Sequence, residues 1–146
     1  MQKTFLLIVI GFSSFFCQAQ VREIPSDVKE SFTEQYPSAL EVTYKDLVVK
    51  VNVHFVLNGE KMIATYTNKG TWRGTEKEWA FDKLRASVKD GFSKSRYAEW
   101  SVDETTILYI PSGVVQYRLR VKKNNLQKKY LFFNTKGRLL REAITL

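Results

Sequence analysis

The amino-acid sequence predicts an α+β fold in which two tandem helix-plus-four-strand repeats form a mostly antiparallel sheet, with both helices on one face. Three observations predict it. Apolar residues recur at steps of four in two short segments, alternating segments with tight turns follow each of them, and matching residues stand at constant spacings in the two halves. A chain of 146 residues can bury such a core without disulfides or metals.

The first 19 residues are predicted to be a secretory signal peptide. They contain a basic residue, Lys3, an apolar run over residues 5–16, and the small residues Cys17 and Ala19. A membrane-spanning helix needs a longer apolar run, of about 20 residues. We therefore expect cleavage after Ala19 and a periplasmic or secreted protein. A lipoprotein with its lipid on Cys17 is the less favoured alternative, because two phenylalanines stand where that signal usually has small residues.

Composition excludes several classes of protein. Cys17 is the one cysteine, so the exported chain has none, which excludes a disulfide scaffold, a cysteine nucleophile and thiolate metal sites. The whole chain has a net charge of +8, and loss of the signal peptide removes only one lysine. For an exported protein this basic charge points away from nucleic acid. It points toward lipid head groups, anionic polysaccharides or acidic protein surfaces.

Two helices are predicted. The first runs from Ile24 to Pro37, with Ser26 as N-cap. The second covers residues 84–96 and matches the first at positions sixty residues later: Leu84, Val88 and Phe92 correspond to Ile24, Val28 and Phe32. Thr-Glu-Lys-Glu at residues 75–78 has the pattern of a capping box, which indicates that the second helix begins earlier still.

Strands follow each helix. In the first half, residues 47–57 alternate, Asn58-Gly59 predicts a tight hairpin, and the chain then returns. The alternation places four residues on one side of this strand: Val49, Val51, Val53 and Phe55. In the second half, residues 114–122 alternate, Asn124-Asn125 forms a turn and residues 127–133 return.

The two hairpins match at a spacing of 67 positions, with Asn58, Tyr66 and Gly70 corresponding to Asn125, Phe133 and Gly137. The seven extra residues fit around a turn at residues 111–113. We therefore expect one repeat at residues 20–76 and the other at residues 77–146, packed as one compact unit. The sheet face without helices would be open to solvent or to a partner.

These patterns resemble a known family. Three motifs look like the secreted PepSY-like, beta-lactamase-inhibitor-like domains: I-P-x-x-V-x-x-x-F-x-x-x-Y-P from Ile24, V-x-V-x-F from Val51 and A-T-Y-T-N-K-G-T-W from Ala64. The second copy has a similar motif, F-N-T-K-G-R-L-L from Phe133. Arg85 replaces the proline expected in the second helix. The resemblance covers nearly all of the exported chain. It implies an exported binding or inhibitory domain with tandem repeats and a concave sheet face, and it implies no catalytic residues.

The residues themselves give no pattern typical of an enzyme. A hydrolytic triad needs a histidine positioned by an acid, but the sole histidine, His54, is expected on the polar face of a strand. Asp103 and Glu104 are adjacent in an apparently extended segment, so their side chains should diverge. The three tryptophans are expected to pack in the core: Trp72, Trp79 and Trp100. We expect no enzyme activity, no cofactor and no metal site.

The positive signal for function lies between residues 116 and 141, where every charged residue is basic. If Leu131 and Phe133 face the core, alternation places five candidate binding residues on the open face: Arg118, Arg120, Lys122, Tyr130 and Phe132. Aromatic residues beside arginines are typical of binding hot spots. This predicts a module that recognises a protein of the cell envelope or exterior, with inhibition as one form of that recognition.

Two alternatives stay open at this point. The basic residues can be a solvated face with the aromatic residues buried against the other repeat or a partner subunit. The basic charge alone can also hold an envelope-associated module on an anionic polysaccharide or on lipid head groups.

Overall fold

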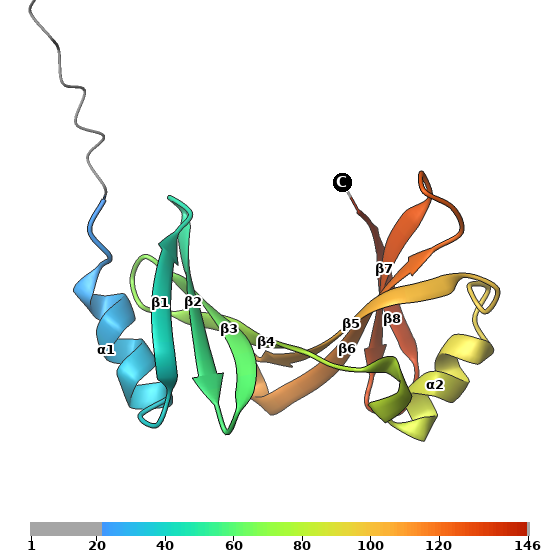
Figure 1. Cartoon of the computed structure of the whole chain (residues 1–146), viewed down its shortest axis with the longest axis horizontal. Coiled ribbons are helices and arrows are strands. Elements are labelled where there is room, and N and C mark those ends of the chain that lie inside the picture. Colours follow the sequence, from blue (N-terminus) through green and yellow to red (C-terminus); the bar gives the residue numbers. More distant parts are fainter. Residues whose placement is uncertain (1–21, 146) are drawn as a thin grey trace, which may run out of the picture.

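A computed structural model describes residues 22–145 (Figure 1). The predicted signal peptide, with Cys17, lies outside the described residues. In the described chain the elements are α1 (Ser26–Gln35), β1 (Leu40–Asp46), β2 (Lys50–Leu57), β3 (Glu60–Thr67), β4 (Trp72–Glu78), η1 (Phe81–Lys83), α2 (Ala86–Ser93), β5 (Ser101–Ile110), η2 (Pro111–Gly113), β6 (Val114–Lys122), β7 (Lys128–Asn134) and β8 (Leu139–Ile144).

The eight strands form a single antiparallel sheet in the order of the sequence, β1 to β8. The predicted α+β class and the mostly antiparallel sheet are confirmed. Strand register runs from Val53 through Ala64, Thr75 and Tyr109 to Val115, so residues of the two halves share one face of the sheet. The predicted boundary between residues 76 and 77 lies within β4.

Both helices lie on that shared face, as predicted, but over separate hydrophobic cores. The core under α1 consists of Val28, Phe32, Val51, Val53, Phe55, Ala64 and Tyr66, with Trp72 packed against it. The core under α2 includes Leu84, Val88, Phe92, Leu119, Val121, Leu131 and Phe133, with Trp79 and Trp100 packed against it. The predicted packing role of the three tryptophans is therefore confirmed.

The sheet bends between the two cores, so the helices lie on its outer side and the uncovered face is concave (Figure 1). The bend lies near the pairing of β4 with β5, which extends over residues 75–78 and 106–109. No helix of the described chain covers this pairing in Figure 1. The concave face therefore lies between two halves that each have their own core.

Both helices begin differently from the prediction. Pro25 is the N-cap of α1, and the hydroxyl of Ser26, the first helical residue, contacts Asp27 rather than a backbone N–H. The predicted capping box at residues 75–78 is wrong, because these residues belong to β4. Thr75 is buried there, and its hydroxyl lies 2.6 Å from the Tyr36 hydroxyl and accepts a 3.0 Å hydrogen bond from the Trp72 indole. Pairing on both sides of β4 outweighs the local helix signal.

The predicted turns are present, and one correction concerns the start of β2. Asn58 and Gly59 have φ angles of 53° and 79°, as a tight hairpin requires. In the second hairpin, the Asn124 side-chain oxygen accepts hydrogen bonds from the backbone N–H groups of Leu126 and Gln127. Val49, predicted to share one side of this strand with Val51, Val53 and Phe55, instead lies exposed in the turn before β2.

Candidate binding face

The concave face is the candidate site, because it is the sheet surface that the helices leave open. We use the name for the side chains that point away from both helices. Cross-strand register assigns them to this face: His54, Ile63, Glu76, Glu78, Glu104, Thr106, Arg118, Arg120, Tyr130 and Phe132.

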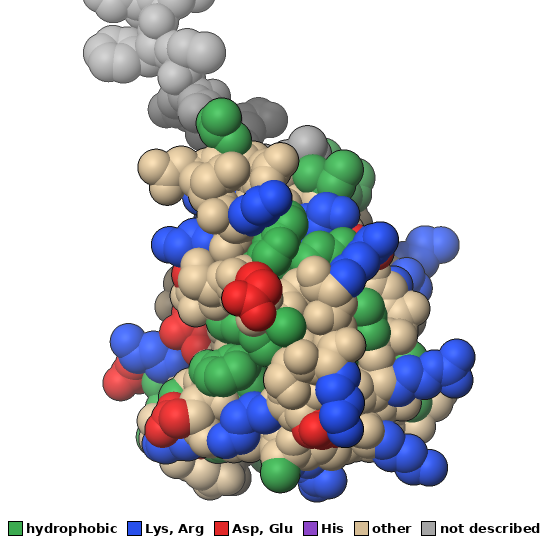
Figure 2. Space-filling model, turned by 90° about the vertical axis from the view of Figure 1, so that its right-hand side faces the viewer, with side chains coloured by type: hydrophobic (Ala, Val, Ile, Leu, Met, Phe, Trp, Pro, Cys, Tyr) green, Lys and Arg blue, Asp and Glu red, His purple; other side chains and the backbone are tan. Residues whose placement is uncertain are grey.

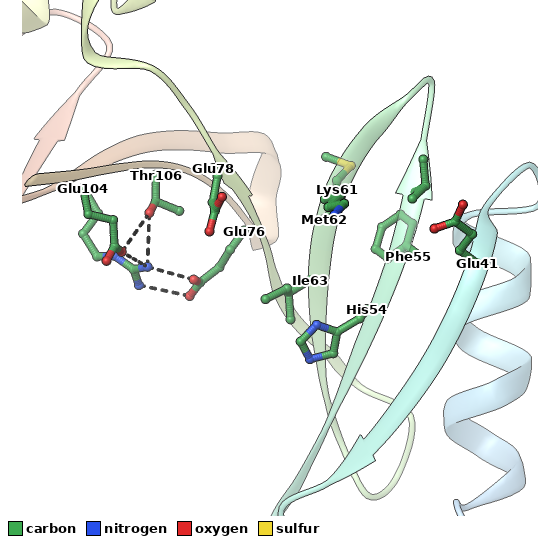
Figure 3. A pocket seen from close by; sticks show the side chains of 12 residues that line it. Glu41, His54, Phe55, Lys61, Met62, Ile63, Glu76, Glu78, Glu104 and Thr106 are labelled. Atoms are coloured by element: carbon green, nitrogen blue, oxygen red, sulfur yellow. Dashed lines mark hydrogen bonds and ion pairs between the residues drawn. The ribbon is translucent and has the colours of Figure 1, made fainter.

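A hollow of about 430 Å³ lies at the centre of this face. Figure 3 shows how strands of the two halves contribute to it: Glu41 comes from β1, His54 from β2, Ile63 from β3, and Glu76 and Glu78 from β4. Glu104, Thr106 and Arg118 complete its lining on the other side. The hollow therefore mixes an apolar patch around Ile63 with carboxylates and with the basic side chains of Lys61 and Arg118.

His54 lies where the sequence predicts, exposed on β2. Within residues 22–145 it takes part in no recorded side-chain hydrogen bond or ion pair. It contributes a polar ring to the rim of the hollow beside Ile63, its cross-strand neighbour (Figure 3).

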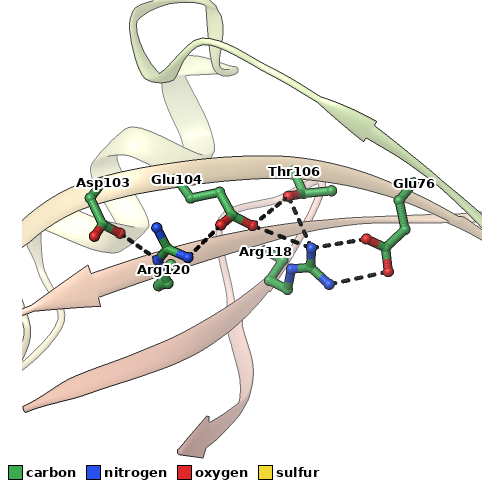
Figure 4. Close-up of polar contacts among 6 residues, drawn as sticks. All are labelled: Glu76, Asp103, Glu104, Thr106, Arg118 and Arg120. Atoms are coloured by element: carbon green, nitrogen blue, oxygen red, sulfur yellow. Dashed lines mark hydrogen bonds and ion pairs between the residues drawn. The ribbon is translucent and has the colours of Figure 1, made fainter. Parts of the chain in front are cut away.

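A row of ion pairs crosses the concave face next to the hollow (Figure 4). Arg118 donates hydrogen bonds of 3.1 and 2.9 Å to the two carboxylate oxygens of Glu76, and its Nη2 lies 3.4 Å from Glu104 Oε1. Arg120 lies between Glu104, at 2.8 Å, and Asp103, also at 2.8 Å. The row thus alternates in sign from β4 to β5.

The prediction that Asp103 and Glu104 diverge is wrong. The register of β5 against β6 shifts between Val102 and Glu104, so Asp103 is the extra residue of a β-bulge. The bulge turns both carboxylates toward Arg120. The hydrogen bond from Arg120 holds the pKa of Asp103 below its usual value, and the hydrogen bond to Asp103 raises the pKa of the Arg120 guanidinium.

The five predicted binding residues lie on one face, since Arg118 pairs with Phe132 across the strands and Arg120 with Tyr130. Their environment differs from the prediction, because the arginines are matched with carboxylates from β4 and β5 and Lys122 lies 4.0 Å from Asp103. Phe132 is only 5% exposed.

The two aromatic residues lie beneath arginines. The Arg141 guanidinium carbon lies 3.3 Å from the Phe132 ring centroid, and that of Arg118 lies 5.0 Å from the Tyr130 ring centroid. Tyr130 is half-buried. The arginines of this half of the face are thus held by carboxylates or stacked on aromatic rings.

Glu76, Glu78 and Glu41 are members of the site that the sequence did not indicate. Glu78 is exposed and lines the hollow (Figure 3). Among the described residues, neither Glu41 nor Glu78 forms a recorded ion pair. Residues of β1, β4 and β5 meet at one hollow only because of the strand pairing, and the local sequence of each strand does not predict that pairing.

A second cluster of charges lies away from the concave face, around Glu142 of β8. The Glu142 carboxylate contacts the Tyr97 hydroxyl and the Arg96 guanidinium, and it accepts a 2.9 Å hydrogen bond from Lys129. These contacts, the tyrosine first, lower the pKa of Glu142 to about 2. The cluster ties the segment after α2 to the last strand.

Comparison with solved structures places the fold. The chain resembles a BLIP-like protein from Bacteroides fragilis, with 23% identity, a TM-score of 0.77, and coverage of 86% of this chain and 89% of that one. It also resembles a DUF2874 family protein from Bacteroides ovatus, with 26% identity, a TM-score of 0.76, and coverage of 84% and 89%. A protein from Bacteroides eggerthii described as periplasmic has 24% identity, a TM-score of 0.72, and coverage of 84% and 90%.

The chain therefore has a BLIP-like fold, which agrees with the inhibitor-like part of the predicted resemblance. No protein-family model matches the sequence, and no curated protein matches it significantly. In residues 22–145, no helix is long and apolar enough to cross a membrane. The same residues contain no group of three or more histidine, cysteine or acidic side chains placed to hold a metal ion.

Proposed function

We propose that this chain is an exported, non-enzymatic binding module that recognises a protein through its concave face. The observation that carries the proposal is the shape of that face, a continuous curved sheet with a hollow of about 430 Å³ and no helix over it in Figure 1. A curved sheet can enclose a convex part of another protein, and such enclosed contacts exclude water and concentrate binding energy. The BLIP-like fold supports an inhibitory form of this recognition.

The lining of the hollow indicates the chemistry of the partner. Ile63 offers an apolar contact, while Glu41 and Glu78 are carboxylates for which no ion pair is recorded in the described chain. A partner that inserts a lysine or arginine side chain can place its methylene groups on Ile63 and its charge beside Glu78. We therefore propose a basic residue of a protein as the group that enters the hollow.

The internal ion pairs favour protein recognition over binding by basic charge alone. Arg118 and Arg120 already face carboxylates, so they present little free charge to a polysaccharide or a lipid head group. Held by several contacts, they lose little side-chain freedom when a partner arrives. We therefore propose that Arg118 and Arg120 give the partner a surface of fixed, alternating positive and negative charges.

We also propose that the two halves are copies of one PepSY-like unit. Each half contains a helix followed by four strands. Gly70 packs near the Asp27 carbonyl of α1, and Gly137 packs near the Ser87 carbonyl of α2. Glycines at matching sequence positions thus allow the same close approach of a turn to the first part of a helix.

The test is capture of a partner from periplasmic and envelope extract with tagged residues 20–146, washed at about 0.15 M and then about 1 M salt, where exposed charges are screened within roughly 3 Å. We expect one stoichiometric protein to survive the second wash. Two concave-face variants, Glu78→Lys and Ile63→Ser, should lose it. The matched control Glu30→Lys, an exposed charge reversal on α1, should retain it.

Two results would overturn the proposal. One is material that elutes wholly with salt, which would show binding by charge alone. The other is a captured protein that all three variants retain equally, because its binding site would then lie outside the concave face. Circular dichroism of each variant verifies that it is folded.

A further inference from the structure

The four most exposed large hydrophobic side chains of the described residues belong to two groups near opposite edges of the sheet. They are Leu126, 95% exposed, Val49, 77%, Ile144, 76%, and Val48, 72%. Val48 and Val49 form the turn between β1 and β2, and Leu126 lies in the loop between β6 and β7. Ile144 ends β8 opposite Lys129, next to that loop. We call these four residues the apolar rim.

Figure 1 shows both turns and the end of β8 at the top of the molecule, on either side of the concave face. Figure 2, which views the β7–β8 end, shows hydrophobic side chains at the top and lysine and arginine side chains around them. Single exposed apolar residues are ordinary on protein surfaces. Pairs of exposed apolar residues at the tips of two turns that project on the same side of the molecule can meet one flat surface together.

Basic residues flank both tips. Lys45 and Lys50 adjoin the first turn, and Lys122, Lys123 and Lys128 surround the second. All are exposed except Lys122, which is half-buried. The acid nearest in sequence to the first turn, Asp46, is engaged with Arg22 at 3.5 Å and with the Val48 backbone N–H at 2.7 Å. The rim thus combines apolar tips with a positive surrounding.

Val48 also carries backbone strain that the fold does not need. Its φ of 70° lies in the left-handed region, which a β-branched residue rarely adopts. Three hydrogen bonds hold it there: its N–H donates to Asp46, and its carbonyl accepts from Arg22 at 2.8 Å and from Asn68 at 2.7 Å. Glycine or asparagine would fit this position better. A strained valine whose side chain is exposed points to a role outside folding.

We propose that the apolar rim docks on a membrane surface that contains anionic lipids. Val48, Val49, Leu126 and Ile144 enter the interface, and the flanking lysines lie beside the head groups. Apolar burial and attraction to anionic lipid add in such binding, which explains why both kinds of residue occur together at each tip.

Arg22, the first described residue, donates a hydrogen bond to the Val48 carbonyl and so lies beside the first tip. None of the four residues of the apolar rim belongs to the concave face, although Lys122, which flanks the second tip, lies on that face.

Flotation with vesicles tests the proposal. Residues 20–146 should float with vesicles of phosphatidylglycerol and phosphatidylethanolamine and much less with phosphatidylcholine alone. The double variant Val49→Ser, Leu126→Ser should bind the anionic vesicles at least about tenfold more weakly. The matched control is Leu40→Ser, which removes a 66% exposed leucine from the opposite end of β1 and should leave binding unchanged.

Val48→Gly separates membrane binding from folding. Because glycine adopts the observed φ without strain, this variant should melt at the same or a higher temperature than the parent. It should nevertheless bind anionic vesicles several-fold more weakly. Ile63→Ser, on the concave face, changes no charge and should not change vesicle binding, which distinguishes this surface from the proposed protein site.

The proposal is wrong if the parent does not float with anionic vesicles. It is also wrong if the rim variants float as well as the parent, since charge alone would then bind the lipid. Dextran sulfate serves as a soluble competitor: if it binds the parent and the rim variants equally and displaces both fully from vesicles, the ligand is a polyanion in general and no apolar insertion occurs.

Discussion

Arg118 of β6 and Glu76 of β4 face each other across β5 and are joined by two hydrogen bonds of 3.1 and 2.9 Å (Figure 4). The cores under α1 and α2 share no residue within the described chain. This bidentate pair is therefore a direct side-chain link between the two halves on the concave side. It also places the arginine at the edge of the hollow.

Removing the pair should weaken the whole fold. We expect Arg118→Ala to lower the free energy of unfolding by about 1–3 kcal/mol, because it leaves the partly buried Glu76 without its donor, while Glu104 keeps its contact with Arg120. Urea denaturation of the Arg118→Ala, Glu76→Ala and double variants gives the coupling energy, which should be about 1 kcal/mol.

As a control, the same double-mutant cycle is measured for Lys94 and Asp90, an exposed pair one helical turn apart whose Nζ and Oδ2 atoms lie 2.7 Å from each other. Its coupling energy should be about 0.3–0.5 kcal/mol. If the two cycles gave equal couplings, the bidentate pair would have no special role in joining the halves.

Gly137 tests the close contact between a turn and α2. A Cβ added there would lie 1.9 Å from the Ser87 carbonyl oxygen, at a φ of 81°. Gly59 has a similar φ of 79° with no atom within 4 Å of the added Cβ. We expect Gly59→Ala to cost about 1–2 kcal/mol from backbone strain alone, and Gly137→Ala to cost at least about 2 kcal/mol more. Equal unfolding midpoints in urea would show that α2 moves freely away from the turn.

Phe132 was predicted as a binding residue, and its burial predicts a structural role as well. Phe132→Ala should lower the free energy of unfolding by about 3–5 kcal/mol, as for other buried phenylalanines. Tyr130→Ala, at the neighbouring half-buried position, should cost clearly less. Denaturation curves of both variants test this, and a Phe132→Ala protein as stable as the parent would mean that Phe132 is available to a partner.

The Glu142 cluster should make stability depend on acid pH. The pKa of Glu142 is lowered from 4.5 to about 2 in the folded protein. The ionised form is therefore favoured by folding, and its contribution is present above about pH 4.5 and is lost as the pH falls toward 2. Thermal unfolding from pH 7 to pH 2 should show a steeper loss in this window for the parent than for Glu142→Gln. Parallel curves would contradict the assigned contacts.

The helices and hairpins could be predicted from the sequence because each depends on residues that are close together in the chain. Asn58-Gly59 fixes its turn by its φ angles, and the apolar steps of α1 and α2 report one buried face. At residues 75–78 two local signals compete, a strand after Gly70 and a helix cap, and only the pairing of β4 with β3 and β5 decides between them.

The site was harder to predict for a related reason. Alternation correctly grouped Arg118, Arg120, Tyr130 and Phe132 on one face, but it contains no information on what lies opposite. Glu76, Asp103 and Glu104 reach the arginines only through strand register and a bulge. Residues 116–141 alone therefore do not show that two of the basic residues, Arg118 and Arg120, are paired with carboxylates from other strands.

The division of the hydrophobic core into two clusters determines how this molecule can deform. Each half is stiffened by its own helix, whereas β4 and β5 are paired only over residues 75–78 and 106–109. Bending therefore concentrates at that seam, and a small change of twist there is amplified at the outer strands in proportion to their distance from it. We therefore expect the distance between the outer strands of the two halves to change by bending at the pairing of β4 with β5, without repacking of either hydrophobic core.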